Sequence, residues 1–211
     1  VGRDRAGELL LSQLEQLGAG DPVVVVAHSM GGVVLTRAAQ LAPGLVAHAV
    51  CLAAIMPASG VPAGAYVRMP ENAGGLVSPS LVADPAAIGA LRLDVASTEP
   101  KYRQQLREAF YGDVAPAVAD AAIALLTPDA PTAITLGTTT LTADGWGSVP
   151  RTYVACTKDM AIRPDLQQRF IAAADAAFPG NPTSVHTLDS SHSPFLSMPG
   201  QVAAIVLKIS R

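Results

Sequence analysis

Residues 21–36 read DPVVVVAHSMGGVVLT, and this stretch decides the fold. Four consecutive valines lead into Ser29, and a second apolar run begins after two glycines. A strand without polar alternation is typical of a parallel sheet and predicts burial on both faces. A buried strand, a tight turn that holds a serine among small residues, and then a helix form the context of a nucleophile elbow. We therefore predict a strand at 22–28, Ser29 in the turn and a helix at 33–41.

The same alternation of strand and helix patterns continues outside this stretch, which indicates an α/β fold with a mainly parallel sheet flanked by helices. The pattern breaks down over 57–150, which is rich in Pro, Gly and Ala and is predicted to be an inserted helical cap. The expected organisation is core at 1–56, cap at 57–150 and core again at 151–211. The further elements predicted are helices at 3–17, 164–177 and 201–209, strands at 48–55, 151–157 and 184–188, and helical pieces of the cap near 102–111 and 114–126.

Composition limits the function classes. The chain has 211 residues, is half hydrophobic, and carries 14 Lys+Arg against 17 Asp+Glu. Because no basic run occurs, we expect neither nucleic acid nor an anionic membrane surface as a main partner. No apolar run approaches the ~20 residues of a membrane span, and no signal peptide is visible, so we expect a cytoplasmic protein. Cofactors are not expected, and a homodimer is left open.

The two cysteines, Cys51 and Cys156, each lie within an apolar run. A free cysteine in such a run behaves as a small core residue. A disulfide framework or a zinc site would need more cysteines or closer spacing, so no metal site is predicted.

A serine hydroxyl needs a base to accept its proton and an acid to orient that base. Asp159 comes just after the strand at 151–157, and His192 lies in the loop after the strand at 184–188. Because parallel strands bring their carboxyl ends to one edge of the sheet, Ser29, Asp159 and His192 can converge. Asp189 is the alternative acid, but it lies only three residues before His192 and would have to fold back on its own loop.

Each of these residues also has a structural interpretation. The motif is Ala-x-Ser-x-Gly, with Ala27 and Gly31 at the two positions that must be small, and a strand–helix turn without chemistry is its alternative. We expect His28 to point away from the site. The remaining candidates are more readily structural or solvated residues: His48, His186, Asp165 and Asp175.

Three blocks of sequence together resemble the plant methylesterase/hydroxynitrile lyase branch of the α/β-hydrolase superfamily and its bacterial esterase relatives. They are AHSMGG at 27–32, VACTKDMAIRP at 154–164 and SHSPFLSMP at 191–199, and REAFYGDV at 107–114 extends the resemblance into the cap. The resemblance implies an α/β-hydrolase fold in which Ser29 is the nucleophile, His192 the general base and Asp159 the residue that orients the imidazole. It also implies that the backbone N–H of Met30 is one donor of the oxyanion hole.

The lyases of this branch resemble one another in a lysine directly after the catalytic histidine, where this chain has Ser193. We therefore favour hydrolysis of a small apolar or aromatic carboxylic ester. A hydroxynitrile lyase or acyltransferase, and a non-catalytic small-molecule-binding protein, remain as alternatives. Met56, Met160 and Phe195 follow the predicted strands or site residues and are expected to line the substrate pocket, with ordinary core packing as the alternative.

The resemblance also implies a strand that ends in a His-Gly loop, the source of the second oxyanion donor, and other strands before the nucleophile strand. No such pattern precedes Ser29. The expectation from this resemblance is that the 211 residues form the C-terminal majority of a longer chain, with the N-terminal strands supplied by a missing segment of the same protein. We expect the 211 residues alone to be poorly soluble or nearly inactive.

Overall fold

A four-stranded parallel sheet lies at the centre of the fold, which a computed structural model describes for residues 2–209. Its strand order is β1-β2-β5-β6, and every neighbouring pair is parallel, as predicted. The apolar runs of the sequence lie side by side in register, with Val26 opposite Val50 and Cys51 opposite Tyr153. The strand bounds are β1 Val23–His28, β2 Val46–Leu52, β5 Arg151–Cys156 and β6 Ser184–Leu188.

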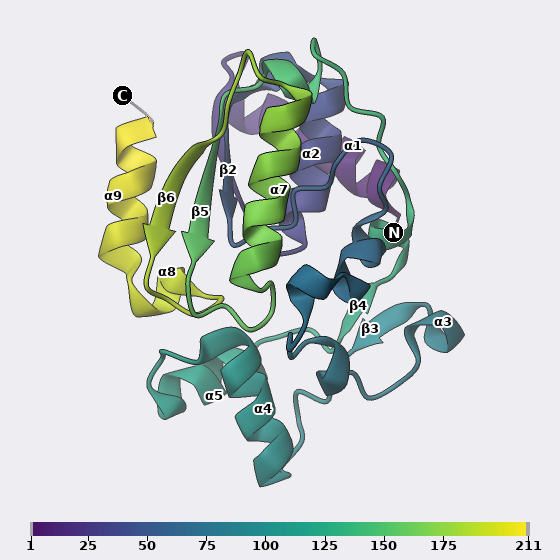
Figure 1. Ribbon diagram of the computed structural model, residues 1–211, viewed down its shortest axis with the longest axis vertical. Coiled ribbons are helices and arrows are strands. Elements are labelled where there is room, and N and C mark those ends of the chain that lie inside the picture. The colour runs from purple at the N-terminus through teal and green to yellow at the C-terminus, as the bar shows by residue number, and fades with distance from the viewer. Residues whose placement is uncertain (1, 210–211) are drawn as a thin grey trace.

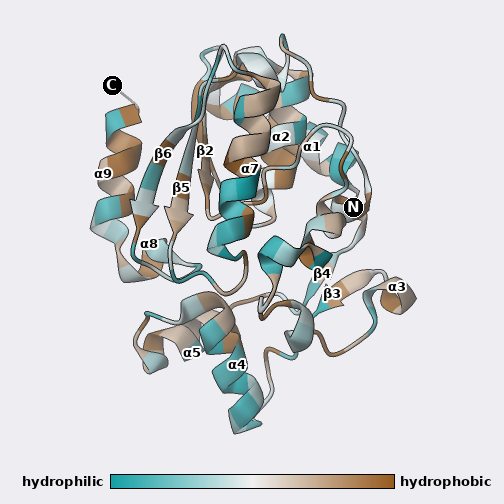
Figure 2. Ribbon diagram, viewed as in Figure 1, coloured by the Kyte–Doolittle hydropathy of each residue, from teal (hydrophilic) through white to brown (hydrophobic). Residues whose placement is uncertain are grey.

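Helices cover both faces of this sheet (Figure 1). On one face the helices α1 (Arg3–Gly18), α2 (Gly31–Leu41) and α7 (Pro164–Ala177) contribute to the main hydrophobic core. On the other face α9 (Pro199–Ile209) contributes Ile205 to a second cluster, and the short helix α8 (Pro194–Ser197) precedes it. Figure 2 shows apolar residues concentrated in the strands and on parts of the flanking helices.

The strand β1 differs from the expected burial on both faces. Only Ala27 is buried in it, and the side chain of Val26 is 43% exposed, so the prediction was wrong for this strand. The cause is its position, because within residues 2–209 β1 pairs only with β2 and therefore forms one edge of the sheet. In β5, which has a neighbour on each side, all six residues are buried.

The stretch between β2 and β5 contains the helices α4 (Pro100–Tyr111) and α5 (Pro116–Ala124), close to the predicted helical pieces. They share a small apolar cluster of their own and lie beyond the arrowheads of β5 and β6 in Figure 1. The last part of the stretch returns to the main core, where Trp146 is buried. The other elements are α3 (Pro85–Ile88), α6 (Ala133–Leu136), the antiparallel strands β3 (Ala90–Arg92) and β4 (Asp129–Pro131), and 3-10 helices at Pro43–Leu45, Ala63–Arg68, Pro70–Asn72, Ser78–Ser80 and Trp146–Ser148.

No helix among residues 2–209 is both long enough and apolar enough to cross a membrane. Cys51 and Cys156 are free and buried, as predicted. Burial raises the pKa of each thiol to about 12, so neither is ionised at neutral pH. A buried thiol of this kind is a poor nucleophile, which leaves the serine as the better candidate.

Candidate active site

Ser29 occupies a strained turn between β1 and α2. Its φ angle is 53°, in the left-handed region that residues other than glycine rarely adopt. Backbone hydrogen bonds hold the turn in place: Ser29 N–H donates to Leu52 O (3.4 Å), and Ser29 O accepts from Ile55 N–H (2.9 Å). A non-glycine residue kept in this conformation by its surroundings is a feature that clusters at functional sites.

The glycines after the serine have different roles in this turn. A Cβ atom on Gly32 would lie 2.3 Å from Ile55 O, so no side chain fits there. A Cβ atom on Gly31 would meet only Ala27 Cβ at 3.8 Å, which is an ordinary contact. The strict requirement for glycine therefore falls on Gly32, which the sequence reasoning did not single out, rather than on Gly31.

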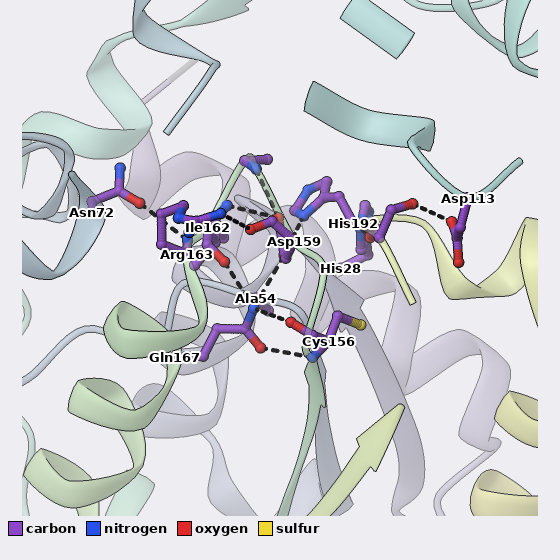
Figure 3. Close-up of polar contacts among 12 residues, drawn as sticks. His28, Ala54, Asn72, Asp113, Cys156, Asp159, Ile162, Arg163, Gln167 and His192 are labelled. Atoms are coloured by element: carbon purple, nitrogen blue, oxygen red, sulfur yellow. Dashed lines mark hydrogen bonds and ion pairs between the residues drawn. The ribbon is translucent and has the colours of Figure 1, made fainter. Parts of the chain in front are cut away.

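Asp159 and His192 are joined by a buried hydrogen bond at the carboxyl edge of the sheet (Figure 3). The distance from His192 Nδ1 to Asp159 Oδ2 is 2.8 Å, and the two side chains are 1% and 0% exposed. Because an ionised carboxylate only accepts, Nδ1 carries the proton that forms this bond. In the neutral imidazole Nε2 is then left with a lone pair, as a general base requires.

The carboxylate of Asp159 is fixed on its other oxygen as well. Asp159 Oδ1 accepts from the backbone N–H groups of Ala161 (2.7 Å) and Ile162 (2.9 Å). Such bonds hold the carboxylate in one orientation toward the imidazole and compensate for its burial.

Gln167 on α7 completes this support, and the sequence reasoning missed it. It is fully buried, and its amide Nε2 lies 3.2 Å from Asp159 Oδ2 and 2.8 Å from Ile162 O. A signal was present in the sequence, since Gln167, Phe170, Ile171 and Ala174 share one helix face and only the first is polar. A polar residue on an otherwise buried face needs partners there, and here they are the Asp159 carboxylate and the backbone of Cys156 and Ile162.

His28 lies against His192 instead of pointing away from the site, so that expectation was wrong. Its Nε2 is 2.7 Å from His192 O, and because a carbonyl only accepts, Nε2 must carry the proton. The two imidazole rings are 4.4 Å apart between centroids, and Phe195 packs edge-on against His28 at 5.0 Å. Burial, with the nearby His192 imidazole, lowers the pKa of His28 to about 3, so this ring is neutral at physiological pH.

The alternative acid, Asp189, lies at the surface. Its side chain is 70% exposed, and its carboxylate binds Lys158 Nζ (2.7 Å) and Thr157 Oγ1 (2.9 Å) rather than a histidine. These hydrogen bonds, that to Lys158 first, lower its pKa. The other candidate histidine and aspartate residues lie away from the His192–Asp159 pair. His48 bonds Thr152 Oγ1, Asp175 accepts from Thr183 N–H, and Asp165 is exposed in the first turn of α7.

The three residues expected to line a pocket occupy different environments. Met56 is 2% exposed and belongs to the main core cluster. Phe195 is 41% exposed and packs on His28. Met160 belongs to the loop at 157–163 that carries Asp159, called the acid loop below. It lines a cavity of about 270 Å³ between the acid loop and α4, together with Leu76, Glu108, Gly112, Lys158 and Ser191.

His192 Nε2 is buried and has no hydrogen-bond partner within residues 2–209, so it does not contact Ser29 Oγ at hydrogen-bond distance. Catalytic hydrogen bonds are often long before substrate binds, and the free Nε2 is available to a hydroxyl or a water molecule. Met30, the residue after the serine, is the N-cap of α2, where backbone N–H groups are unsatisfied by the helix. Residues 2–209 contain no group of three or more His, Cys, Asp or Glu side chains placed to hold a metal ion.

A parallel sheet with a serine in a left-handed strand–helix turn, and a buried His–Asp pair at the same edge, defines an α/β hydrolase. The sequence of residues 3–205 matches the alpha/beta hydrolase family, and the chain belongs to that family.

The chain is also similar to individual proteins and solved structures. It is 30% identical over 209 residues to Methylesterase 9 of Arabidopsis thaliana, an alignment that covers 95% of this chain and 76% of the relative. A pyrethroid hydrolase of Sphingobium wenxiniae is 27% identical over 184 residues, with 87% and 61% covered. Among solved structures, the pyrethroid hydrolase of Sphingobium faniae has a similar fold, with a TM-score of 0.77 at 23% identity over 99% of this chain and 77% of that one. The crystal structure of polyneuridine aldehyde esterase gives a TM-score of 0.73 at 20% identity, with 97% and 78% covered.

Proposed function

We propose that this protein is a serine hydrolase that cleaves a small apolar or aromatic carboxylic ester through an acyl-enzyme on Ser29. The observation that carries the proposal is the buried 2.8 Å hydrogen bond from His192 Nδ1 to Asp159, which leaves Nε2 without a partner in the described chain. An imidazole held in this tautomer is suited to accept a proton from a serine hydroxyl. The names of the relatives, methylesterase and pyrethroid hydrolase, support an ester as the substrate.

In the first half of the reaction Ser29 Oγ attacks the ester carbonyl carbon while His192 Nε2 takes the hydroxyl proton. Asp159 stabilises the imidazolium that forms. The backbone N–H of Met30 donates to the oxyanion of the tetrahedral intermediate. Collapse of the intermediate breaks the bond to the alcohol oxygen, which leaves with the proton from His192, and the acyl group stays on Ser29.

In the second half a water molecule attacks the acyl carbon, with His192 Nε2 again as the base. The bond to Ser29 Oγ breaks, the serine recovers its proton from His192, and the carboxylic acid is released. Met56, Met160 and Phe195 are proposed as substrate-contacting residues, with Met160 the best supported because it lines the cavity next to the acid loop.

Burst kinetics test this function directly. With a chromogenic acetate ester, we expect a rapid release of about one equivalent of alcohol per active site, followed by slower turnover, if deacylation is the slower step. A protein that only binds small molecules would show neither phase. Release of an aldehyde or ketone from a cyanohydrin, without ester turnover, would instead identify a lyase.

A further inference from the structure

The segment at 190–193, which carries His192, is buried along its whole length. Several elements hold it in place. Lys158 N–H donates to Ser190 O (2.9 Å) from the acid loop, and Ser190 Oγ is 2.9 Å from Ser197 Oγ on α8. From β1, His28 donates to His192 O (2.7 Å).

The cap region also reaches this segment. Asp113 follows α4 directly after Gly112, and its Oδ1 accepts a short hydrogen bond from Ser191 Oγ (Figure 3). Phe110, one turn earlier, places its ring 5.9 Å from the His192 ring. The C-terminal end of α4 thus contacts the histidine segment at two adjacent points.

Asp113 has a charge suited to this contact. Burial alone would raise its pKa, but the hydrogen bond from Ser191 and the proximity of the Ser190 and Ser197 hydroxyls lower the pKa below its usual value. An ionised carboxylate forms a stronger bond to a hydroxyl than a neutral acceptor does. The cavity of about 270 Å³ opens at the same junction, because Gly112 and Ser191 both line it.

We infer that Asp113 is a positioning residue for the general base: through Ser191 it attaches the end of α4 to the His192 segment and keeps the imidazole aligned with Ser29. Small displacements of a reacting group are costly in rate, and catalytic groups depend on a supporting set of contacts around them. A contact from the cap region also makes the alignment of His192 depend on how the α4 end is seated. Because a positioning role requires a reaction, this inference rests on the proposed ester hydrolysis.

The test compares Asp113→Ala, Ser191→Ala and the double variant in steady-state ester hydrolysis. Each single variant is expected to lower kcat about 10-fold because the contact orients the base. The KM of Asp113→Ala should change little, since Asp113 is not among the residues that line the cavity. The double variant should be no slower than either single one, because both remove the same interaction. Asp113→Asn keeps an acceptor oxygen and should retain most of the activity. If Asp113→Ala does not fold, Ser191→Ala removes the same contact from the other partner.

Asp120→Ala is the matched control. Asp120 lies on α5 and binds Arg103 (2.7 Å) and Arg107 (2.6 Å) of α4, so its loss removes carboxylate ion pairs from the same helix but leaves the contacts of the α4 end with the histidine segment in place. We expect its kcat to stay at the wild-type value. A similar loss of kcat in Asp120→Ala and Asp113→Ala would overturn the positioning role, as would additive effects of Asp113→Ala and Ser191→Ala.

A second measurement does not depend on ester hydrolysis. Hydrogen exchange of the backbone amides in 188–197 should be faster in Asp113→Ala than in the wild type and unchanged in Asp120→Ala. Unchanged exchange in Asp113→Ala would refute the attachment itself. If Ser29→Ala kept full activity, the proposed function would be wrong. The exchange measurement would still test whether the Asp113–Ser191 contact holds the histidine segment.

Discussion

Ser29 is both the strained residue of the turn between β1 and α2 and the proposed nucleophile. Replacing it by alanine removes one oxygen and leaves the backbone hydrogen bonds of the turn in place. We expect Ser29→Ala to reduce ester hydrolysis about 10⁴-fold or more, because members of a catalytic triad act as a unit. The unfolding midpoint should stay close to the wild-type value. A variant that keeps most of its activity would show that the nucleophile lies elsewhere.

The two candidate acids can be separated with matched amide substitutions. In Asp159→Asn the new amide group either donates to His192 Nδ1 or loses its hydrogen bond to the imidazole. Both outcomes favour the wrong imidazole tautomer. Turnover should therefore fall about 10⁴-fold, by analogy with the serine protease triad. Asp189→Asn removes only a surface ion pair with Lys158, which is worth little. Its kcat should therefore remain within about two-fold of the wild type. The reverse ranking of the two variants would assign the acid role to Asp189.

His28 predicts a pH effect on stability. Its pKa is about 3 in the folded protein against 6.5 for an unperturbed histidine, so the unfolded state binds an extra proton between these values. Stability should therefore fall as the pH is lowered from 6.5 toward 3, and this residue alone should contribute roughly 2–4 kcal/mol by pH 4. His28→Phe cannot take up the proton. Urea unfolding from pH 7 to pH 4 should show a shallower loss of stability in the variant, and parallel profiles would contradict the neutral, buried state of His28.

In the turn between β1 and α2, we expect alanine substitutions at two adjacent glycines to differ in their effect on stability. Gly32→Ala would place a Cβ 2.3 Å from Ile55 O, so the turn must deform, and we expect a loss of about 1–3 kcal/mol or a failure to fold. Gly31→Ala meets only Ala27 Cβ at 3.8 Å and should cost much less. Denaturant midpoints of the two variants measure the difference. Equal destabilisation would mean that the approach of Ile55 does not constrain the turn.

The elements with strong periodic signals were predictable from the sequence. The valine run gave β1, and the strand at 184–188 and the helix at 164–177 agree with β6 and α7 to the residue. The strands β3 and β4 were not predicted, because Ala90–Arg92 and Asp129–Pro131 are only three residues long and lack alternation, and the second includes a proline. Their pairing depends on tertiary contacts, among them the ion pair of Arg92 with Asp129 at 2.7 Å.

Part of the candidate site was also predictable from the sequence, and part was not. The positions of Asp159 and His192 after parallel strands were enough to predict that they meet, because the topology of the sheet brings those strand ends together. The contacts of His28, Gln167 and Asp113 depend on side-chain directions in the packed structure. Helical spacing marks Gln167 as a polar residue on a buried face, but its partners, and the contacts of His28 and Asp113, could be found only from the structure.

The side of β1 that has no partner strand within residues 2–209 bears on how whole chains associate. Val26 is 43% exposed there, and a groove of about 440 Å³ runs beside it, lined in part by Leu9, Leu10 and Val25. An apolar edge strand is a template for pairing with another chain. We therefore expect the 211-residue chain to self-associate, and Val26→Lys to reduce that association by placing a charge on the edge.

Sedimentation velocity over a range of protein concentrations measures this association. Val185→Lys is the control, because it adds the same charge at a similarly exposed valine (45%) on β6, the opposite edge of the sheet. The strand β6 also carries Ser184, His186 and Thr187 and is less apolar than β1. A wild-type chain that stays monomeric at high concentration would refute the role of the β1 edge in association.

The central claim, a nucleophilic Ser29 activated by the His192–Asp159 pair, can be measured by covalent labelling. A fluorophosphonate reacts with activated serines and leaves a stable adduct, which intact-mass spectrometry counts and peptide mapping locates. We expect one adduct per chain, located on Ser29, suppressed by excess ester substrate and absent from Ser29→Ala. An adduct on another serine, or one that persists in Ser29→Ala, would contradict the assignment of the nucleophile.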